Sequence, residues 1–229
     1  MNYRKLLRTR DSDLKKVFPD YLRSELRYLK RNIPAKKINI LSWDIETSQM
    51  ETKVWQLKKN DYIEPTRITK DWNIICWSAK ALNGKMYNDT LTPSEAKKGD
   101  DERVVRSLWK LLNSQDYIVA HNGDRFDIKK ANARFLKYGL PLPDYFKTVD
   151  TLKISRKYFN LSSNKLDYVC KFVGLEGKFS TGGIALWDAC EKGDKKALKK
   201  MSRYCDVDVK ILEKLFIRLM PYIKNFPII

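Results

Sequence analysis

Apolar and polar residues alternate along much of the first half of the chain, as they do along β-strands. Asn83 and Gly84 separate two such runs, and this dipeptide is typical of a tight hairpin turn. The stretch 47–70 is polar and irregular. The pattern predicts strands at residues 38–46, 73–82, 84–91 and 116–121.

Later segments carry the three- to four-residue spacing of amphipathic helices. One of them ends at Gly139 with Pro141 just beyond, which is a common way for a helix to stop. Antiparallel strands followed by helix, strand and helix predict an α/β fold, with a mixed sheet and helices on both of its faces. The predicted helices span residues 101–113, 127–139, 164–173 and 195–219.

Composition indicates the size of the domain and where the protein is located. The 229 residues are 43% hydrophobic, which is enough for one sizeable domain with its own core. No apolar run approaches the roughly 18–20 residues of a membrane span, and the N-terminus lacks the apolar region of a signal peptide. We therefore expect no membrane association and a cytoplasmic location.

Cysteine and histidine usage argues against a structural zinc site. The four cysteines form no CxxC pair, and the chain has one histidine, His121. Reduced thiols are the simplest expectation.

Charge narrows the range of partners. Lys and Arg number 46 against 28 Asp and Glu, a formal net charge of +18. Such a balance attracts polyanions, of which nucleic acid is the commonest, although a merely lysine-rich solvated surface is the alternative.

Residues 1–37 look like a basic N-terminal extension to a domain at residues 38–229. They contain twelve Lys and Arg against four acidic residues. A helix is predicted within 19–32, with Leu22, Leu26 and Leu29 on one stripe. It is either a solvated helix docked on the core or an arm that binds nucleic-acid backbone, and both interpretations stay open.

Three acidic residues draw attention because of where the pattern places them. Asp44 and Glu46 end the first strand on one face, where two neighbouring carboxylates repel each other and lose hydration. Taken alone, that pair is most simply a solvated strand end. Asp127 begins a predicted helix, where an acid complements the helix dipole, so alone it is most simply a cap.

Asp208 changes this interpretation. The apolar stripe of the last predicted helix includes Met201 and Leu212, and at about 100° per residue Asp208 lies on that stripe. Asp206 points roughly 160° away and is expected to be solvated. Tyr204 lies one turn before Asp208 on the same face. A buried carboxylate needs a proton, a cationic partner or a metal ion.

Four carboxylates at one end of the sheet would require cations. Oxygen ligands alone favour Mg²⁺ or Mn²⁺ over zinc. Two such ions roughly 3.5–4 Å apart are the arrangement that supports in-line displacement at phosphorus. Together with the basic charge, the carboxylates Asp44, Glu46, Asp127 and Asp208 indicate phosphodiester hydrolysis.

The sequences around these residues resemble a known family. WDIET, HNGDRFD and YCDVD are similar, in order and spacing, to the three motifs of the RNase H-like 3′–5′ exonucleases of the DEDD superfamily. Those motifs read D-x-E, N-x(2–3)-[FY]-D and Y-x3-D. Tyr204 resembles the tyrosine of the DEDDy subclass, which includes the proofreading domains of family B DNA polymerases. The resemblance spans about residues 38–217 and implies an RNase H-like mixed sheet of five to six strands flanked by helices.

The resemblance also implies roles for the residues that match its motifs. Asp44 would bridge two Mg²⁺ or Mn²⁺ ions, and Glu46 and Asp208 would complete the site of the ion on the nucleophile side. Asp127 would hold the second ion, and Tyr204 would orient the attacking water.

Asn122 and Phe126, which match the second motif, would lie near the terminal nucleotide. Lys178, beside a glycine-containing loop, is a candidate contact to the substrate backbone, although an ordinary turn is as good an interpretation of that loop. His121 and Asp150 are expected to be structural.

Trp55 and Tyr62 follow the first motif. Packing over the sheet is the slightly favoured expectation for both, and stacking on an unpaired base is the alternative.

The sequence thus predicts a metal-dependent 3′–5′ exonuclease that acts on single-stranded DNA 3′ ends and releases nucleoside monophosphates, in replication, recombination or repair. An exoribonuclease that processes RNA 3′ ends is the alternative, and an inactive nucleic-acid-binding module is the weaker one. Family B polymerases continue into a larger catalytic domain that this chain lacks. The chain is a free-standing exonuclease, a proofreading protein that acts in trans, or a piece cut from something longer, and the starting methionine favours the free-standing form. We expect a monomer, with a separate polymerase or other replication protein as a candidate partner.

Overall fold

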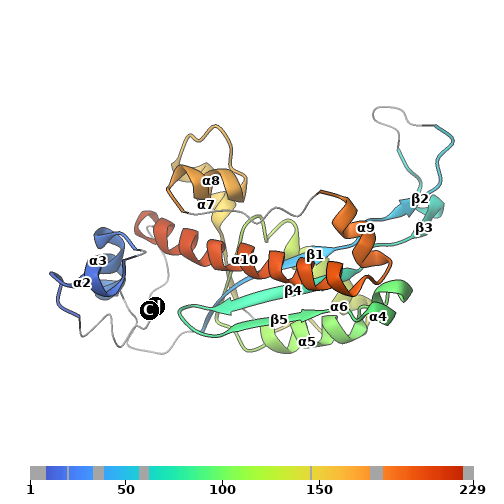
Figure 1. The fold of residues 1–229 in the computed structure, drawn as a ribbon, viewed down its shortest axis with the longest axis horizontal. Helices are drawn as coiled ribbons and strands as arrows, with labels where there is room; N and C mark the ends of the chain where they lie inside the picture. The colour runs from blue at the N-terminus through green and yellow to red at the C-terminus, as the bar shows by residue number, and fades with distance from the viewer. Residues whose placement is uncertain are drawn as a thin grey trace.

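A mixed five-stranded sheet forms the centre of the computed structural model (Figure 1). Its strands are β1 (Ile40–Thr47), β4 (Ile74–Ala81), β5 (Met86–Thr90), β6 (Tyr117–Ala120) and β7 (Lys147–Asp150). In space they follow the order β5-β4-β1-β6-β7. The β5-β4-β1 half is antiparallel and the β1-β6-β7 half is parallel, which confirms the predicted mixed sheet with five strands. The structure describes residues 9–19, 21–32, 39–56, 62–144, 146–175 and 183–223.

Helices cover the two faces of the sheet. They are α4 (Pro93–Lys98), α5 (Glu102–Leu112), α6 (Asp127–Lys137), α7 (Thr151–Tyr158), α8 (Leu166–Phe172), α9 (Ala185–Glu191) and α10 (Lys195–Leu219). Figure 1 shows α10 crossing one face, with α5 and α6 on the other. No helix among the described residues is both long enough and apolar enough to span a bilayer.

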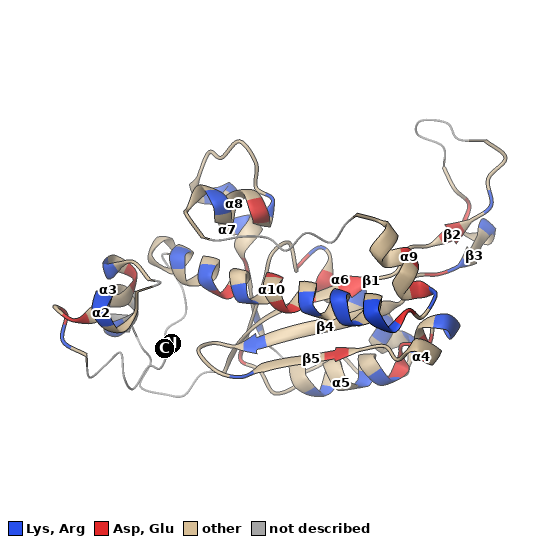
Figure 2. Ribbon diagram, viewed as in Figure 1, with Lys and Arg blue, Asp and Glu red and all other residues tan. Residues whose placement is uncertain are grey.

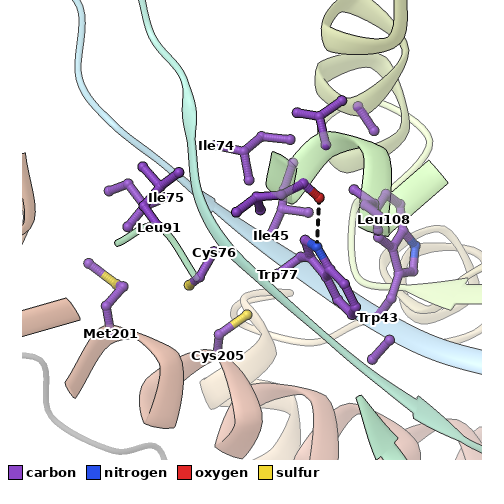
Figure 3. Packing of buried hydrophobic residues seen from close by; sticks show 14 of the residues in the cluster. Trp43, Ile45, Ile74, Ile75, Cys76, Trp77, Leu91, Leu108, Met201 and Cys205 are labelled. Carbon is purple, nitrogen blue, oxygen red and sulfur yellow. Dashed lines mark hydrogen bonds between the residues drawn. The ribbon is translucent and has the colours of Figure 1, made fainter. Parts of the chain in front are cut away.

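The alternation of β1 divides its side chains between these two faces. Trp43 and Ile45 are buried in the core on the side of α5, where the Trp77 indole N–H donates to the carbonyl of Val104 at 3.0 Å (Figure 3). Asp44 points to the other side, where Cys205 of α10 packs against it. The period-two pattern therefore places the acidic residues of β1 beneath α10.

Most predicted elements are confirmed with slightly shorter ends. Asn83 adopts a left-handed φ of 59° in the β4–β5 turn, as the dipeptide predicts. The helix at 195–219 has the predicted bounds. Several short elements of the domain were not predicted, among them α4, α7, α9 and β7. A signal for α4 was present, since Thr92 and Glu95 form a capping box at its start.

The described part of the N-terminal extension is helical and packs on the domain. It contains α2 (Leu14–Val17) and α3 (Arg23–Asn32). Leu14 and Leu26 are fully buried in a cluster that also contains Phe216 of α10. Glu25, 3% exposed, forms an ion pair with Arg218. These contacts support the interpretation of a helix docked on the core.

One detail of the predicted stripe was wrong. Leu22 is 44% exposed, because α3 begins one residue later and the Leu22 N–H donates to the Glu25 carboxylate at 2.8 Å. The side chain of Leu29 and the proposed boundary at residue 37 lie outside the described residues.

In the chain, a two-stranded ribbon follows β1 and precedes β4. It is built from β2 (Glu51–Thr52) and β3 (Ile68–Lys70), with the 3-10 turn η1 (Pro65–Arg67) before β3. A second 3-10 turn, η2 (Met220–Tyr222), follows α10.

Candidate active site

The second half of β1 has an open side, because its pairing with β6 covers only residues 40–42. β6 ends at Ala120, and the chain then turns sharply through Asn122, which has a φ of 68°. A Cβ at position 123 would overlap the Cβ of Ala120, so this turn needs Gly123. The turn brings Asp127, at the start of α6, against β1, where its Oδ1 accepts the Ile45 N–H at 3.3 Å.

Three of the four predicted acidic residues converge beside this open stretch. Carboxylate oxygens of Asp44, Glu46 and Asp208 all lie within 4.8 Å of one another. Asp127 lies beside the group, since its charge is the largest electrostatic contribution that raises the pKa of Asp44. Residues separated by up to 164 positions in the sequence thus meet at one end of the sheet, as the motifs predict.

The third motif is carried by α10. Tyr204 and Asp208 are both buried, and the Trp187 ring packs edge-on against Tyr204 with 6.3 Å between the centroids. The Cys205 thiol lies 3.4 Å from the carbonyl oxygen of Asp44 and 3.7 Å from its Oδ2. This contact ties α10 to the strand that carries the first motif.

Asp206 is not the solvated residue that helical geometry predicted. Its carboxylate accepts a hydrogen bond from the Ser78 hydroxyl at 2.7 Å and from the Asn88 amide at 3.1 Å. The prediction was wrong because α10 lies flat across β4 and β5, so a side chain on its flank still meets the sheet.

Burial and mutual repulsion control the protonation of the carboxylates. Burial is the main factor that raises the pKa of Asp44 well above its usual range, followed by the charges of Asp127, Glu46 and Asp208. Burial likewise raises the pKa of Asp127 to about 7, although hydrogen bonds from its own N–H and that of Ile45 oppose this. Without a cation, Asp127 is therefore partly protonated at neutral pH, where an ordinary aspartate is ionised.

Tyr204 is kept in its neutral form by the same surroundings. Burial and the nearby charges of Asp208 and Glu46 raise the pKa of its phenol above the usual value of 10. The phenol is therefore protonated at neutral pH and can orient a ligand through a hydrogen bond, but it cannot serve as a base.

The structure supports the structural roles expected for His121 and Asp150. The two ring nitrogens of His121 lie 2.9 Å from the Thr151 hydroxyl and 2.8 Å from the Asn164 carbonyl, and burial lowers its pKa. Asp150 caps α7 and accepts the Asn122 N–H at 2.9 Å. These contacts hold the turn that precedes Asp127.

A cavity of about 1120 Å³ opens beside the carboxylates. Asp208, His121 and Asn122 are among its lining residues. Arg156 of α7 and Lys165, just before α8, also line it and contribute positive charge. Sequence reasoning did not single out these two cations.

Two predicted substrate residues have different outcomes. Phe126 is 40% exposed at the start of α6, where the ammonium of Lys130 lies 5.6 Å from its ring and 3.6 Å from that of Trp72. Its side chain is thus available beside the site. Lys178 lies outside the described residues, and its role stays a prediction.

The donor set fits a hard divalent cation. Asp44, Glu46 and Asp208 offer only oxygen ligands. Burial, and then the neighbouring carboxylates, raise the pKa of Asp44, and a bound cation would oppose this shift. The arrangement can therefore hold Mg²⁺ or Mn²⁺ at the end of β1.

Comparison with known proteins defines the class to which this fold and site belong. A family model described as the RNase_H superfamily matches residues 43–220, and the chain belongs to that superfamily. A PolC-type DNA polymerase III from Ureaplasma parvum is 31% identical over 120 residues, which are 52% of this chain and 8% of that protein. The chain thus spans a small fraction of the curated relative that it matches.

A solved structure shows the same fold. The family B DNA polymerase from the hyperthermophilic archaeon Pyrobaculum calidifontis superposes with a TM-score of 0.60 at 19% identity, over 82% of this chain and 25% of that one. Together with the family match, this confirms the predicted resemblance to the RNase H-like exonuclease domains of DNA polymerases. The tyrosine subclass and the individual residue roles stay predictions.

Proposed function

We propose that this chain is a metal-dependent 3′–5′ exonuclease that hydrolyses single-stranded DNA from its 3′ end and releases nucleoside monophosphates. The observation that carries the proposal is the group of Asp44, Glu46 and Asp208 oxygens within 4.8 Å of one another on an RNase H-like fold. Tyr204, one helical turn before Asp208, completes the pattern of the tyrosine-type enzymes.

Asp44, Glu46, Asp127 and Asp208 would hold the metal ions. When bound, two Mg²⁺ or Mn²⁺ ions supply an activated water and stabilise the leaving oxygen. Asp127 keeps the end of β1 in place through its hydrogen bond to Ile45. The protonated phenol of Tyr204 orients the attacking water, because its raised pKa excludes proton abstraction.

The cavity beside Asp208 is the proposed site of the terminal nucleotides. Arg156 and Lys165 would offset the phosphate charge there, and Asn122 lines the same cavity. Phe126, half-exposed at the start of α6, offers a ring face to the base of the 3′-terminal nucleotide. Figure 2 shows further Lys and Arg residues on α7, on α8 and along the exposed side of α10, which suits a polyanionic substrate.

DNA is the proposed substrate because both described relatives are, by name, DNA polymerases. The same names support a role in replication or repair, with a polymerase as the proposed partner, present as a separate chain or as part of a longer one. An exoribonuclease that processes RNA 3′ ends is the competing possibility that the test must exclude.

The test is digestion of end-labelled single- and double-stranded DNA and RNA with Mg²⁺, with Mn²⁺ or with EDTA. We expect metal-dependent shortening of single-stranded DNA from the 3′ end. Asp208→Asn should abolish hydrolysis and retain binding, while Asp144→Asn, an exposed acid outside the site, should behave as wild type. Faster cleavage of RNA would overturn the choice of substrate, and no hydrolysis of any 3′ end would overturn the enzyme.

A further inference from the structure

Two aromatic side chains that follow the first motif stand in solvent. Trp55 is 94% exposed and Tyr62 is 82% exposed, more than any other described aromatic residue. The expectation that they pack over the sheet was therefore wrong. Large aromatic side chains normally bury most of their surface, so two exposed ones in the same connection between β2 and β3 indicate a binding surface.

Both residues lie between β2 and β3 in the chain, and the base of the β2–β3 ribbon is firmly attached to the domain. The Gln49 N–H donates to Glu191 of α9 at 3.1 Å, and the Gln49 amide donates to Asp188 at 3.0 Å. Lys70 forms an ion pair with Glu191 at 2.8 Å. The described ends of the ribbon are thus held by side-chain contacts and are not a loose loop.

The ribbon begins where the carboxylate-bearing strand ends. Ser48, two residues after Glu46, accepts and donates hydrogen bonds with Asn73 at the start of β4, which closes the base of the ribbon beside the site. Figure 1 shows β2 and β3 projecting beyond the end of the sheet to which β1 runs. A single strand of nucleic acid that leaves the carboxylates in this direction would pass along the ribbon.

The charge of the ribbon selects the class of partner. Lys53 and Arg67 are exposed on it and form no ion pair within the described part of the chain. Exposed ring faces beside free cations match single-stranded nucleic acid, in which bases stack on aromatic groups and phosphates contact lysine and arginine.

We propose that Trp55 and Tyr62 form a stacking platform for unpaired bases of the strand whose 3′ end lies at the carboxylates. The inference rests on the proposed function and extends it, since it assigns a second contact region outside the cavity. Stacking does not depend on base identity, so the platform would hold any sequence. It would serve binding and leave the chemical step unchanged.

Binding is tested in the Asp208→Asn background, where the substrate is not consumed. Fluorescence anisotropy with a labelled 20-nucleotide single strand should show about a tenfold weaker affinity for Trp55→Ala, and a larger loss for the double variant with Tyr62→Ala, because stacking contributes roughly 1–3 kcal/mol per base. Leu136→Ala, which removes an 81% exposed apolar side chain from α6, is the matched control. An abasic strand of the same length should bind all four proteins with similar affinity.

A second readout in the active protein separates this inference from the proposed function. Trp55→Ala should raise KM for long single strands about tenfold at unchanged kcat. Affinity equal to that of Leu136→Ala would overturn the platform, even if hydrolysis occurs as proposed. If the wild type shows no hydrolytic activity and the variants still bind DNA more weakly than it does, the platform is upheld and the proposed exonuclease activity is overturned. Unchanged DNA affinity with loss of polymerase binding would reassign the surface to a protein partner.

Discussion

Two of the described regions in which this protein buries charge balance that charge in different ways. Where the N-terminal extension docks, the nearly buried Glu25 is matched by Arg218. At the end of β1, by contrast, the pKa of Asp44 is raised by burial and by three further carboxylates. In the first region the chain supplies the opposite charge and fastens two elements together. In the second it accumulates like charge, which is unfavourable for folding and is explained by a cation that arrives from solution.

The same contrast holds at other ion pairs of the described structure. Asp101, fully buried, is paired with Arg134. Lys80 and Glu213 lie 2.8 Å apart beneath α10. Because the fold provides partners for these buried acids, the carboxylate cluster stands out as a place where charge serves binding and not stability.

The largest expected effect is on stability at the docked extension. Glu25→Ala should lower the free energy of unfolding by about 3–5 kcal/mol, because it leaves the Arg218 guanidinium partly buried without its partner. Urea unfolding of the metal-free protein measures this. Asp44→Asn should instead leave stability unchanged or raise it, since it removes a repelled carboxylate of similar shape. If Glu25→Ala and Asp44→Asn lowered the free energy of unfolding equally, the contrast between the two regions would be contradicted.

The pH dependence of the free energy of unfolding of the metal-free protein should report directly on the carboxylates at the end of β1. The folded-state pKa of Asp127, about 7, lies above the unfolded value of 3.8, so the folded protein holds a proton that the unfolded chain has released. Its stabilising contribution is therefore complete below about pH 4 and is lost as pH rises toward 7. We expect a loss of about 2 kcal/mol between pH 5 and pH 7.

Urea unfolding at several pH values in EDTA measures this loss, and Asp127→Asn is the control. The amide cannot ionise and still accepts the Ile45 N–H, so the variant should show a flatter pH profile. A profile as steep as that of the wild type would assign the effect to other groups.

A smaller effect is expected at Tyr204. Tyr204→Phe should lower kcat about tenfold, the loss expected from one hydrogen bond to the attacking water. Since the phenol remains protonated, the pH profile of kcat should keep its shape. Steady-state kinetics from pH 6 to pH 9 tests this: a rise of kcat with pH in the wild type that is lost in Tyr204→Phe would show that the phenol acts as a base.

Local patterns predicted the parts of this fold that depend on local physics. Strand β1 and helix α10 follow from periods of two and 3.6 residues, and Asp208 was noticed because it interrupts an apolar stripe. The environment of Asp206 was missed because it depends on how α10 lies across β4 and β5. Likewise, Arg156 reaches the cavity only through the packing of α7, for which no nearby residue in the sequence gives a signal.

The exposure of Trp55 was missed for the opposite reason. Hydrophobic character predicts burial, and it fails where a side chain is kept in solvent for a partner that the sequence does not contain. The resemblance to the three motifs implied roles for the acidic residues, but the ribbon lies between motifs and belongs to none of them.

The central claim is that a divalent cation completes the carboxylate cluster. The most direct test is the melting temperature of the wild type and of Asp44→Asn during titration with Mg²⁺ or Mn²⁺ at pH 7.5. Binding at one hundred times Kd should stabilise the wild type by about 2.7 kcal/mol, which raises its Tm by several degrees, and should leave Asp44→Asn nearly unchanged. No shift in the wild type with either ion, or an equal shift in the variant, would contradict the account.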